Sequence, residues 1–92
     1  MQRDRAEMIA VRALGWLAGN DELMPVFLGA TGSVAEDLRA GAGDPAFLIS
    51  VLDFLAMDDA WIIGFCDAEG LDYQAPMQAR QALPGGAETH WT

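Results

Sequence analysis

Hydrophobic residues recur along the chain at intervals of three and four residues, the spacing that places them on one face of a helix. In the first segment, residues 5–18, the apolar positions with this spacing are Ile9, Ala10, Ala13, Leu14 and Leu17. No window shows the sustained apolar–polar alternation that is typical of a half-buried strand. The pattern therefore predicts an all-α fold without a β-sheet, with helices over roughly 60–75% of the chain.

Side chains that can cap a helix mark where the later helices begin. Asn20 and Asp58 each carry an oxygen that can accept a hydrogen bond from the free N–H groups of a first turn. Ser33 and Glu36 have the S-x-x-E spacing of a capping box, in which each side chain satisfies a free N–H near the other. Asp44 is followed by a proline, which loses nothing at the first helical position because its missing N–H would be unpaired there anyway.

Glycines mark where these helices end. Gly19 is expected to adopt the left-handed conformation that closes a helix. Gly32 and Gly70 are expected to end the second and the fifth helix. A last helix is predicted over residues 72–83, before the Pro-Gly-Gly run at residues 84–86. The expected architecture is a compact bundle of five or six short helices.

The chain has 92 residues, which leaves room for one small hydrophobic core. We therefore expect a single helical domain over residues 1–86 and a flexible C-terminal tail over 87–92. The sequence also echoes itself at an offset of 38 residues. The identical pairs are Leu14/Leu52, Leu17/Leu55, Ala18/Ala56, Asp21/Asp59, Phe27/Phe65, Ala30/Ala68 and Gly32/Gly70. Because caps and glycine stops match in phase, the echo favours a duplicated three-helix unit, with repeats 6–43 and 44–83. A chance match between amphipathic helices is the alternative.

Composition narrows the classes of function. Fourteen acidic residues against five arginines and no lysine give a net charge of −9 and a pI near 4.1. Such a surface repels a phosphate backbone, which argues against direct binding of nucleic acid. Asp53, Asp58 and Asp59 interrupt the longest apolar stretch, residues 46–66, and each would cost roughly 2.5–3.5 kcal/mol in a membrane span. A single cysteine and no secretory signal indicate the cytoplasm.

The residues form no recognisable catalytic, cofactor-binding or metal-binding pattern. The one histidine, His90, falls in the predicted tail, and Cys66 is interpreted as a small buried hydrophobe. One histidine and one cysteine are too few ligands for a zinc site, and the glycines lack the strand–turn–helix context of a phosphate loop. We therefore expect no enzyme, no cofactor and no metal. The alternative is an orphan enzyme or enzyme subunit that uses the carboxylates of Asp58, Asp59 and Asp67.

Between residues 44 and 72 the chain contains seven acidic residues and no basic one. Asp58 and Asp59 stand near the centre of this segment, with Trp61 and Ile63 close by as apolar anchors. The pattern predicts a small acidic adaptor that binds a protein partner with a basic patch through these four residues. Two alternatives stay open: a solvated acidic face over a self-sufficient core, and a regulator of nucleic-acid processing that acts through a protein partner. The sequence is compatible with a monomer or a homodimer.

Five motifs together resemble a known family. They are LGWLA at 14–18, FLxxTG at 27–32, DPAFL at 44–48, FLA at 54–56 and ALPGG at 82–86. This combination is similar to the DUF3572 family, a small, mainly alphaproteobacterial family of helical proteins classed as a domain of unknown function. The resemblance covers nearly the whole chain and implies a cytoplasmic, single-domain helical protein. It transfers no catalytic residue.

Overall fold

Six helices follow one another through residues 1–85, the part of the chain that the computed structural model describes, and no strand occurs in that part. The helices are α1 (Arg3–Ala18), α2 (Leu23–Thr31), α3 (Asp37–Gly41), α4 (Pro45–Leu55), α5 (Asp59–Glu69) and α6 (Ala75–Ala82). They hold 71% of the described residues. The prediction of an all-α bundle is confirmed, and the predicted tail at 87–92 lies outside the described residues.

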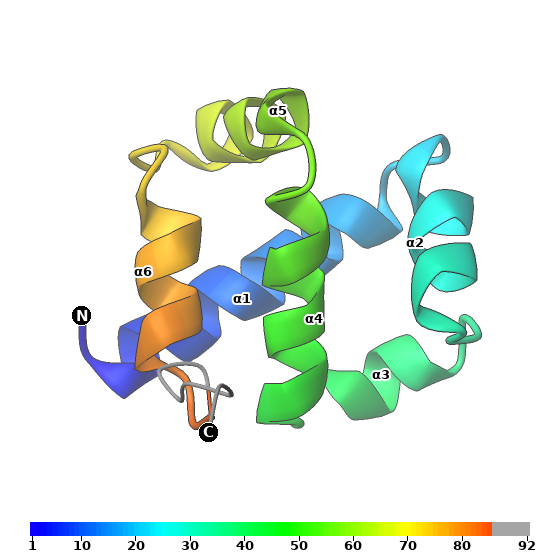
Figure 1. Ribbon diagram of the computed structural model, residues 1–92, viewed down its shortest axis with the longest axis horizontal. Coiled ribbons are helices and arrows are strands. Elements are labelled where there is room, and N and C mark those ends of the chain that lie inside the picture. Colours follow the sequence, from blue (N-terminus) through cyan, green and yellow to red (C-terminus); the bar gives the residue numbers. More distant parts are fainter. Residues whose placement is uncertain (86–92) are drawn as a thin grey trace, which may run out of the picture.

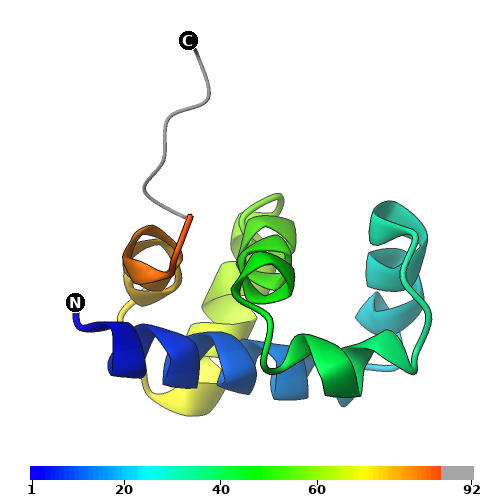
Figure 2. The same ribbon diagram turned by 90° about the horizontal axis from the view of Figure 1, so that it is seen from below.

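The helices form two layers that cross each other. Figure 1 shows α1 running behind α4 at a steep angle, with α6 on one side of α4 and α2 on the other. In Figure 2, α1 and α3 lie in the lower layer, whereas α4 and α6 lie above them. The most extensive contacts of α1 are with α6 and α4. The core therefore lies where α1 crosses these two helices.

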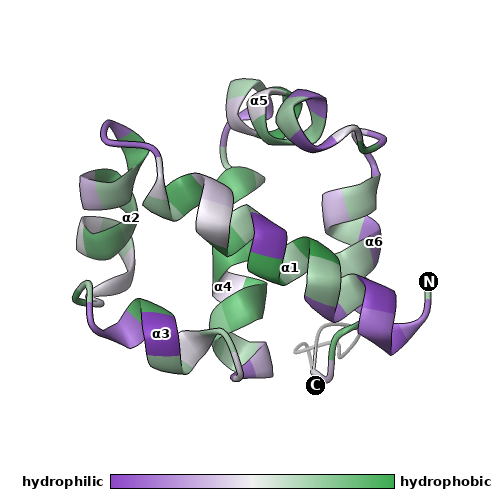
Figure 3. Cartoon of the chain, turned by 180° about the vertical axis from the view of Figure 1, so that it is seen from behind, coloured by the Kyte–Doolittle hydropathy of each residue, from purple (hydrophilic) through white to green (hydrophobic). Residues whose placement is uncertain are grey.

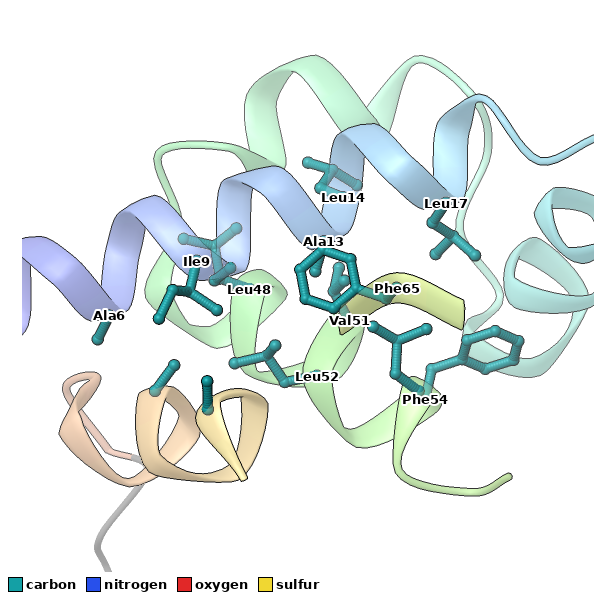
Figure 4. Close-up of a cluster of buried hydrophobic side chains, with 14 of the residues drawn as sticks. Ala6, Ile9, Ala13, Leu14, Leu17, Leu48, Val51, Leu52, Phe54 and Phe65 are labelled. Carbon is teal, nitrogen blue, oxygen red and sulfur yellow. The ribbon is translucent and has the colours of Figure 1, made fainter. Parts of the chain in front are cut away.

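Side-chain size explains how closely the layers approach. Ala6, Ala10 and Ala13 on α1 and Ala75 and Ala79 on α6 are all buried, and their small side chains let the two helices pack tightly. Larger side chains fill the remaining space, and the fully buried ones include Ile9, Leu17, Phe27, Val51, Leu52, Leu55, Phe65 and Leu83. Figure 4 shows the labelled side chains of α1, α4 and α5 meeting in one cluster. In Figure 3, α4 is hydrophobic over most of its length, as its central position requires.

The two aspartate caps are confirmed. The Asp44 carboxylate accepts a hydrogen bond from the Ala46 N–H at 3.0 Å, and Asp58 accepts one from the Ala60 N–H at 2.9 Å. The two expected glycine stops also hold, because Gly32 and Gly70 have left-handed φ values of 71° and 68°. Each of these signals is local: a cap joins an aspartate to an N–H two residues away, and a glycine stop depends on the φ of the glycine itself.

Other expectations about helix ends are wrong in whole or in part. Gly19 does end α1 as its C-cap, but with φ −86° and ψ 0° it is right-handed rather than left-handed, and its N–H donates to Gly15 O. The Ser33–Glu36 capping box does not form. Instead the carboxylate of Asp37 accepts from the Val34 N–H at 2.9 Å and closes a turn ahead of α3, so that helix begins only at Asp37.

The last helix begins at Ala75 rather than near residue 72, because Pro76 occupies its first turn and fixes φ at a helical value there. Asn20 does accept hydrogen bonds from the N–H groups of Glu22 and Leu23, at 3.1 and 3.0 Å. It caps a tight turn, and α2 starts after this turn at Leu23.

The two halves of the chain follow similar paths. In Figure 1, α1 and α4 cross, and α2 and α5 turn off at their far ends. The third helices differ, because α3 contacts mainly α4 whereas α6 packs on both α1 and α4. The matched residues Phe27 and Phe65 are both fully buried, as are Leu17 and Leu55. Whether the halves superpose as a duplicated unit stays a prediction.

Candidate protein-interaction site

The predicted site begins at the turn between α4 and α5. Asp58 and Asp59 are exposed there, and so is Met57, whose exposed fraction of 72% is the largest among the exposed large hydrophobic residues of the described chain. The Asp58 carboxylate is held in place by its cap on Ala60, whereas Asp59 is the first residue of α5. Neither aspartate forms an ion pair within residues 1–85. The turn thus presents two exposed negative charges, one of them held by its cap, beside one large apolar side chain.

Trp61 and Ile63 point to different sides of α5, because two residues correspond to a rotation of roughly 200° about a helix axis. Trp61 is half-buried, and its indole stacks on Phe54 of α4 with ring centroids 4.7 Å apart and an angle of 19° between the rings. Ile63 is 43% exposed and lies one turn from both Asp59 and Asp67 on the outward face. The structure therefore groups Ile63 with the acidic residues and turns Trp61 towards α4.

Two carboxylates of the acidic segment are paired with arginines from distant parts of the chain. Arg80 of α6 binds both carboxylate oxygens of Asp53, and Arg12 of α1 lies 3.2 Å from Glu69. No basic residue occurs between residues 44 and 72, but the fold places Arg12 from before this segment and Arg80 from after it next to two of its carboxylates. The uncompensated negative charge is therefore concentrated at the α4–α5 turn and on the outward face of α5.

Of the three carboxylates named for the enzyme alternative, Asp58 and Asp59 are adjacent at the start of α5, and Asp67 lies about two turns further along the helix. Asp58 and Asp67 are separated by nine residues, about 13 Å along a helix axis, which is too far for a pair acting on one bond. Asp67 accepts a hydrogen bond from the Tyr73 hydroxyl at 2.8 Å, and this bond raises the pKa of Tyr73. Asp58 is engaged as a cap. Asp58 and Asp67 thus each have a structural role, whereas Asp59 is exposed at the first position of α5.

Cys66 is fully buried, as expected for a small hydrophobe, and its Sγ donates to the Asp72 carbonyl oxygen at 3.3 Å. Burial raises the pKa of its thiol, and the negative charges of Asp67 and Asp72 raise it further. Within residues 1–85, no three histidine, cysteine, aspartate or glutamate side chains gather closely enough to hold a metal ion. No helix in this range is both long and apolar enough to cross a membrane.

A groove between α2 and α4 lies next to the turn and is absent from the sequence-based site. Its volume is about 290 Å³, and its lining residues are Ala30, Thr31, Ser50, Asp53, Phe54 and Met57. We call it the α2–α4 groove. The two helices are held apart by Phe27 of α2, whose ring meets Phe54 edge to face at 5.3 Å. Met57 lies in the turn and also lines the groove, so this exposed side chain connects the two surfaces.

Sequence patterns alone could not locate this groove. Five of its six lining residues come from α2 and α4, two helices whose separation depends on the packing of Phe27 against α4, and the sixth, Met57, comes from the turn after α4. The one signal available was Met57, a large apolar residue directly before an aspartate cap.

Comparison with known proteins identifies the family but adds no named relative. No curated protein and no solved structure matches the chain significantly. The family described as a protein of unknown function, DUF3572, matches residues 3–86, almost the whole of the chain. The chain therefore belongs to the DUF3572 family.

Proposed function

We propose that this protein is a small acidic interaction module of the cytoplasm, which binds a basic region of a protein partner. The observation that carries the proposal is the surface formed by Met57, Asp58, Asp59 and Ile63, which we call the α4–α5 corner. It joins exposed apolar side chains to carboxylates that have no ion pair within the described residues.

The electrostatics of this corner favour a cationic partner. Charges a few ångströms apart at a surface repel by only about 1 kcal/mol or less, so the folded chain tolerates them. A lysine or arginine from a partner would remove that repulsion. The net charge of −9 would also attract such a partner over a long range and speed its association.

The apolar side chains at the corner would supply contact area once the partner has arrived. Met57 is 72% exposed and Ile63 is 43% exposed, so both can bury surface without any change in fold. Burial of such side chains within a ring of polar groups is how protein interfaces gain much of their stability. The same charge that attracts a basic protein repels nucleic acid, so a role in nucleic-acid processing would act through a protein partner.

The test is quantitative affinity capture from the native host with immobilised wild-type and variant proteins. Asp59→Lys and Asp58→Lys reverse the two charges. Asp58→Asn keeps a capping side chain and removes only the charge. We expect a partner that is enriched by the wild type at low salt, reduced by both reversals, and released as the salt concentration rises.

A partner held equally by the wild type and by all three variants at low salt would overturn the role of the corner. Circular dichroism of each variant shows whether the helices are intact, which separates loss of binding from loss of fold. Loss of the Asp58 cap by itself costs roughly 1 kcal/mol, so the asparagine variant is the matched control.

A further inference from the structure

The packing of α5 on α1 shows how this chain fills the space between two helices. A ring carbon of Trp16 lies 3.3 Å from the point that a Cβ of residue 64 would occupy, so the indole covers Gly64 closely. One turn away along α1, Arg12 reaches across to Glu69 on α5 at 3.2 Å. An aromatic ring and an ion pair thus bridge α1 and α5.

The offset of 38 residues relates this helix pair to α4 and α2. Ser50 stands where α1 has Arg12, and Thr31 stands where α5 has Glu69. Neither hydroxyl reaches across the gap, because each donates to a carbonyl of its own helix. Ser50 Oγ donates to Phe47 O at 2.6 Å, and Thr31 Oγ1 donates to Phe27 O at 2.8 Å. Ser50 and Thr31, which correspond to Arg12 and Glu69 at this offset, therefore leave the α2–α4 groove open, whereas the Arg12–Glu69 ion pair bridges α1 and α5.

The lining of the groove selects the chemistry of an occupant. Of its six lining residues only Asp53 is charged, and Met57 leads directly to Asp58 and Asp59. No basic residue lines it, since Arg80 approaches Asp53 from α6, on the other side of α4. Its volume of about 290 Å³ lies at the lower end of the roughly 300–1,000 Å³ of pockets that enclose small ligands, and it leaves room for an apolar side chain.

We propose that the α2–α4 groove receives an apolar side chain from a basic amphipathic helix of a protein partner, whose cations meet Asp58 and Asp59 beside the groove. This proposal rests on the proposed function and adds the anchor site and the form of the partner. A second copy of the chain is a poor occupant, because it has no lysine and carries the same net charge of −9. The ion pairs of Arg3, Arg12 and Arg80 also leave few of its five arginines for an intermolecular contact.

The test is an NMR titration of the full-length, ¹⁵N-labelled protein with a defined probe. The probe is a synthetic amphipathic peptide of about 18 residues made of leucine and lysine, enough for a five-turn helix. A peptide of the same composition with its leucines scattered around the helix is the control for charge alone. We expect saturable amide shifts at the residues of the α2–α4 groove with the amphipathic peptide, and weaker, diffuse shifts with the scattered one.

The decisive variant is Thr31→Glu combined with Ser50→Arg, which copies the Glu69–Arg12 pair into the groove. It leaves the net charge unchanged, so it tests the groove separately from the electrostatics. We expect it to weaken binding of the amphipathic peptide by about tenfold or more. Ala30→Gln is a second blocking variant at an exposed position and should weaken binding in the same direction even if the double variant does not fold.

The possible failures of the two proposals are distinguishable. If both blocking variants bind the peptide like the wild type while Asp59→Lys weakens binding, the groove is not the anchor and the acidic corner alone recognises the partner. If the blocking variants lose binding and the charge reversals do not, the groove stands and the electrostatic function fails. Groove shifts that depend on protein concentration without peptide would mean that a second copy occupies it, and would overturn the proposal.

Discussion

Phe27 is the central contact between α2 and the core, with the half-buried Leu23, Met24 and Leu28 packed around it. It is the only buried residue of α2, and its ring meets Phe47 and Phe54 edge to face, with centroids 5.9 and 5.3 Å away. Its counterpart at the 38-residue offset, Phe65, is also fully buried and packs edge to face against Trp16 at 6.0 Å. Each half thus places one phenylalanine where its second helix meets the core.

We expect Phe27→Ala and Phe65→Ala each to lower the free energy of unfolding by about 3–5 kcal/mol, because a buried ring is lost and a cavity remains. This is a large share of the stability of a small domain. Chemical denaturation followed by circular dichroism measures it. Val26→Ala, at a side chain 49% exposed, is the control and should change little. An unchanged unfolding midpoint for both phenylalanine variants would show that these rings do not hold the fold.

Cys66 links stability to alkaline pH. Burial, aided by the charges of Asp67 and Asp72, raises the pKa of its thiol above the ordinary value of 9.0. A folded-state pKa above the unfolded one means that the stabilisation is present below pH 9 and is lost as the pH rises through the folded pKa. Between about pH 8 and pH 11 the wild type should therefore lose more stability than Cys66→Ala.

Tyr73 titrates in the same pH range, because its hydrogen bond to Asp67 raises its pKa above the ordinary value of 10.0. The comparison is therefore made in a Tyr73→Phe background, by urea denaturation at each pH. Parallel pH profiles with and without the thiol would contradict the assignment to Cys66.

At the scale of the elements, Gly41 decides how α3 meets α4. A Cβ at this position would lie 2.2 Å from a ring carbon of Phe47, so no side chain fits unless that ring moves. Phe47 in turn packs against Phe27, and a shift would be passed on to α2. We expect Gly41→Ala to destabilise the fold by roughly 1–3 kcal/mol through overpacking.

Gly43→Ala is the matched control, since nothing lies within 4 Å of its Cβ position and its φ is not left-handed. It should be neutral or slightly stabilising, because alanine restricts the unfolded chain more than glycine does. Thermal denaturation of the two variants side by side measures the difference. Equal melting temperatures would mean that Phe47 yields at no cost.

The elements also show which parts of the structure can be predicted from sequence. Asp44 and Asp58 were identified because a cap depends on atoms only two residues away. The Ser33 capping box fails because Asp37 competes for the nearby free N–H of Val34. Gly19 ends α1 as predicted but keeps a right-handed conformation, which the presence of a glycine does not determine. The ion pairs of Asp53 and Glu69 involve residues 27 and 57 positions distant, which no local pattern reveals. For the same reason Met57 could be noticed as unusual but the groove beside it could not be found.

At the scale of the whole molecule, the two related halves should superpose. Superposition of residues 9–32 on residues 47–70 is expected to bring Phe27 onto Phe65 and Leu17 onto Leu55, since in both halves the second helix turns off at the far end of the first. Helix-crossing angles that differ between the halves would show that the 38-residue echo is coincidence. If the halves do superpose, the α1–α5 and α2–α4 helix pairs are equivalent. They then differ in that the Arg12–Glu69 ion pair bridges α1 and α5, whereas the α2–α4 groove is open.

The halves should nevertheless depend on each other for folding. The main partners of α1 are α4 and α6, both in the second half, so residues 1–43 alone would expose Ile9 and Leu17 to water. Chains of this length rarely fold without a complete core or an added constraint. We therefore expect fragments 1–43 and 44–92 each to lose most of the helical circular dichroism signal. An equimolar mixture should recover part of it, more at higher salt because both fragments are net negative. A fragment that is fully helical and unfolds cooperatively by itself would show that each half has its own core, and that α1 does not depend on α4 and α6.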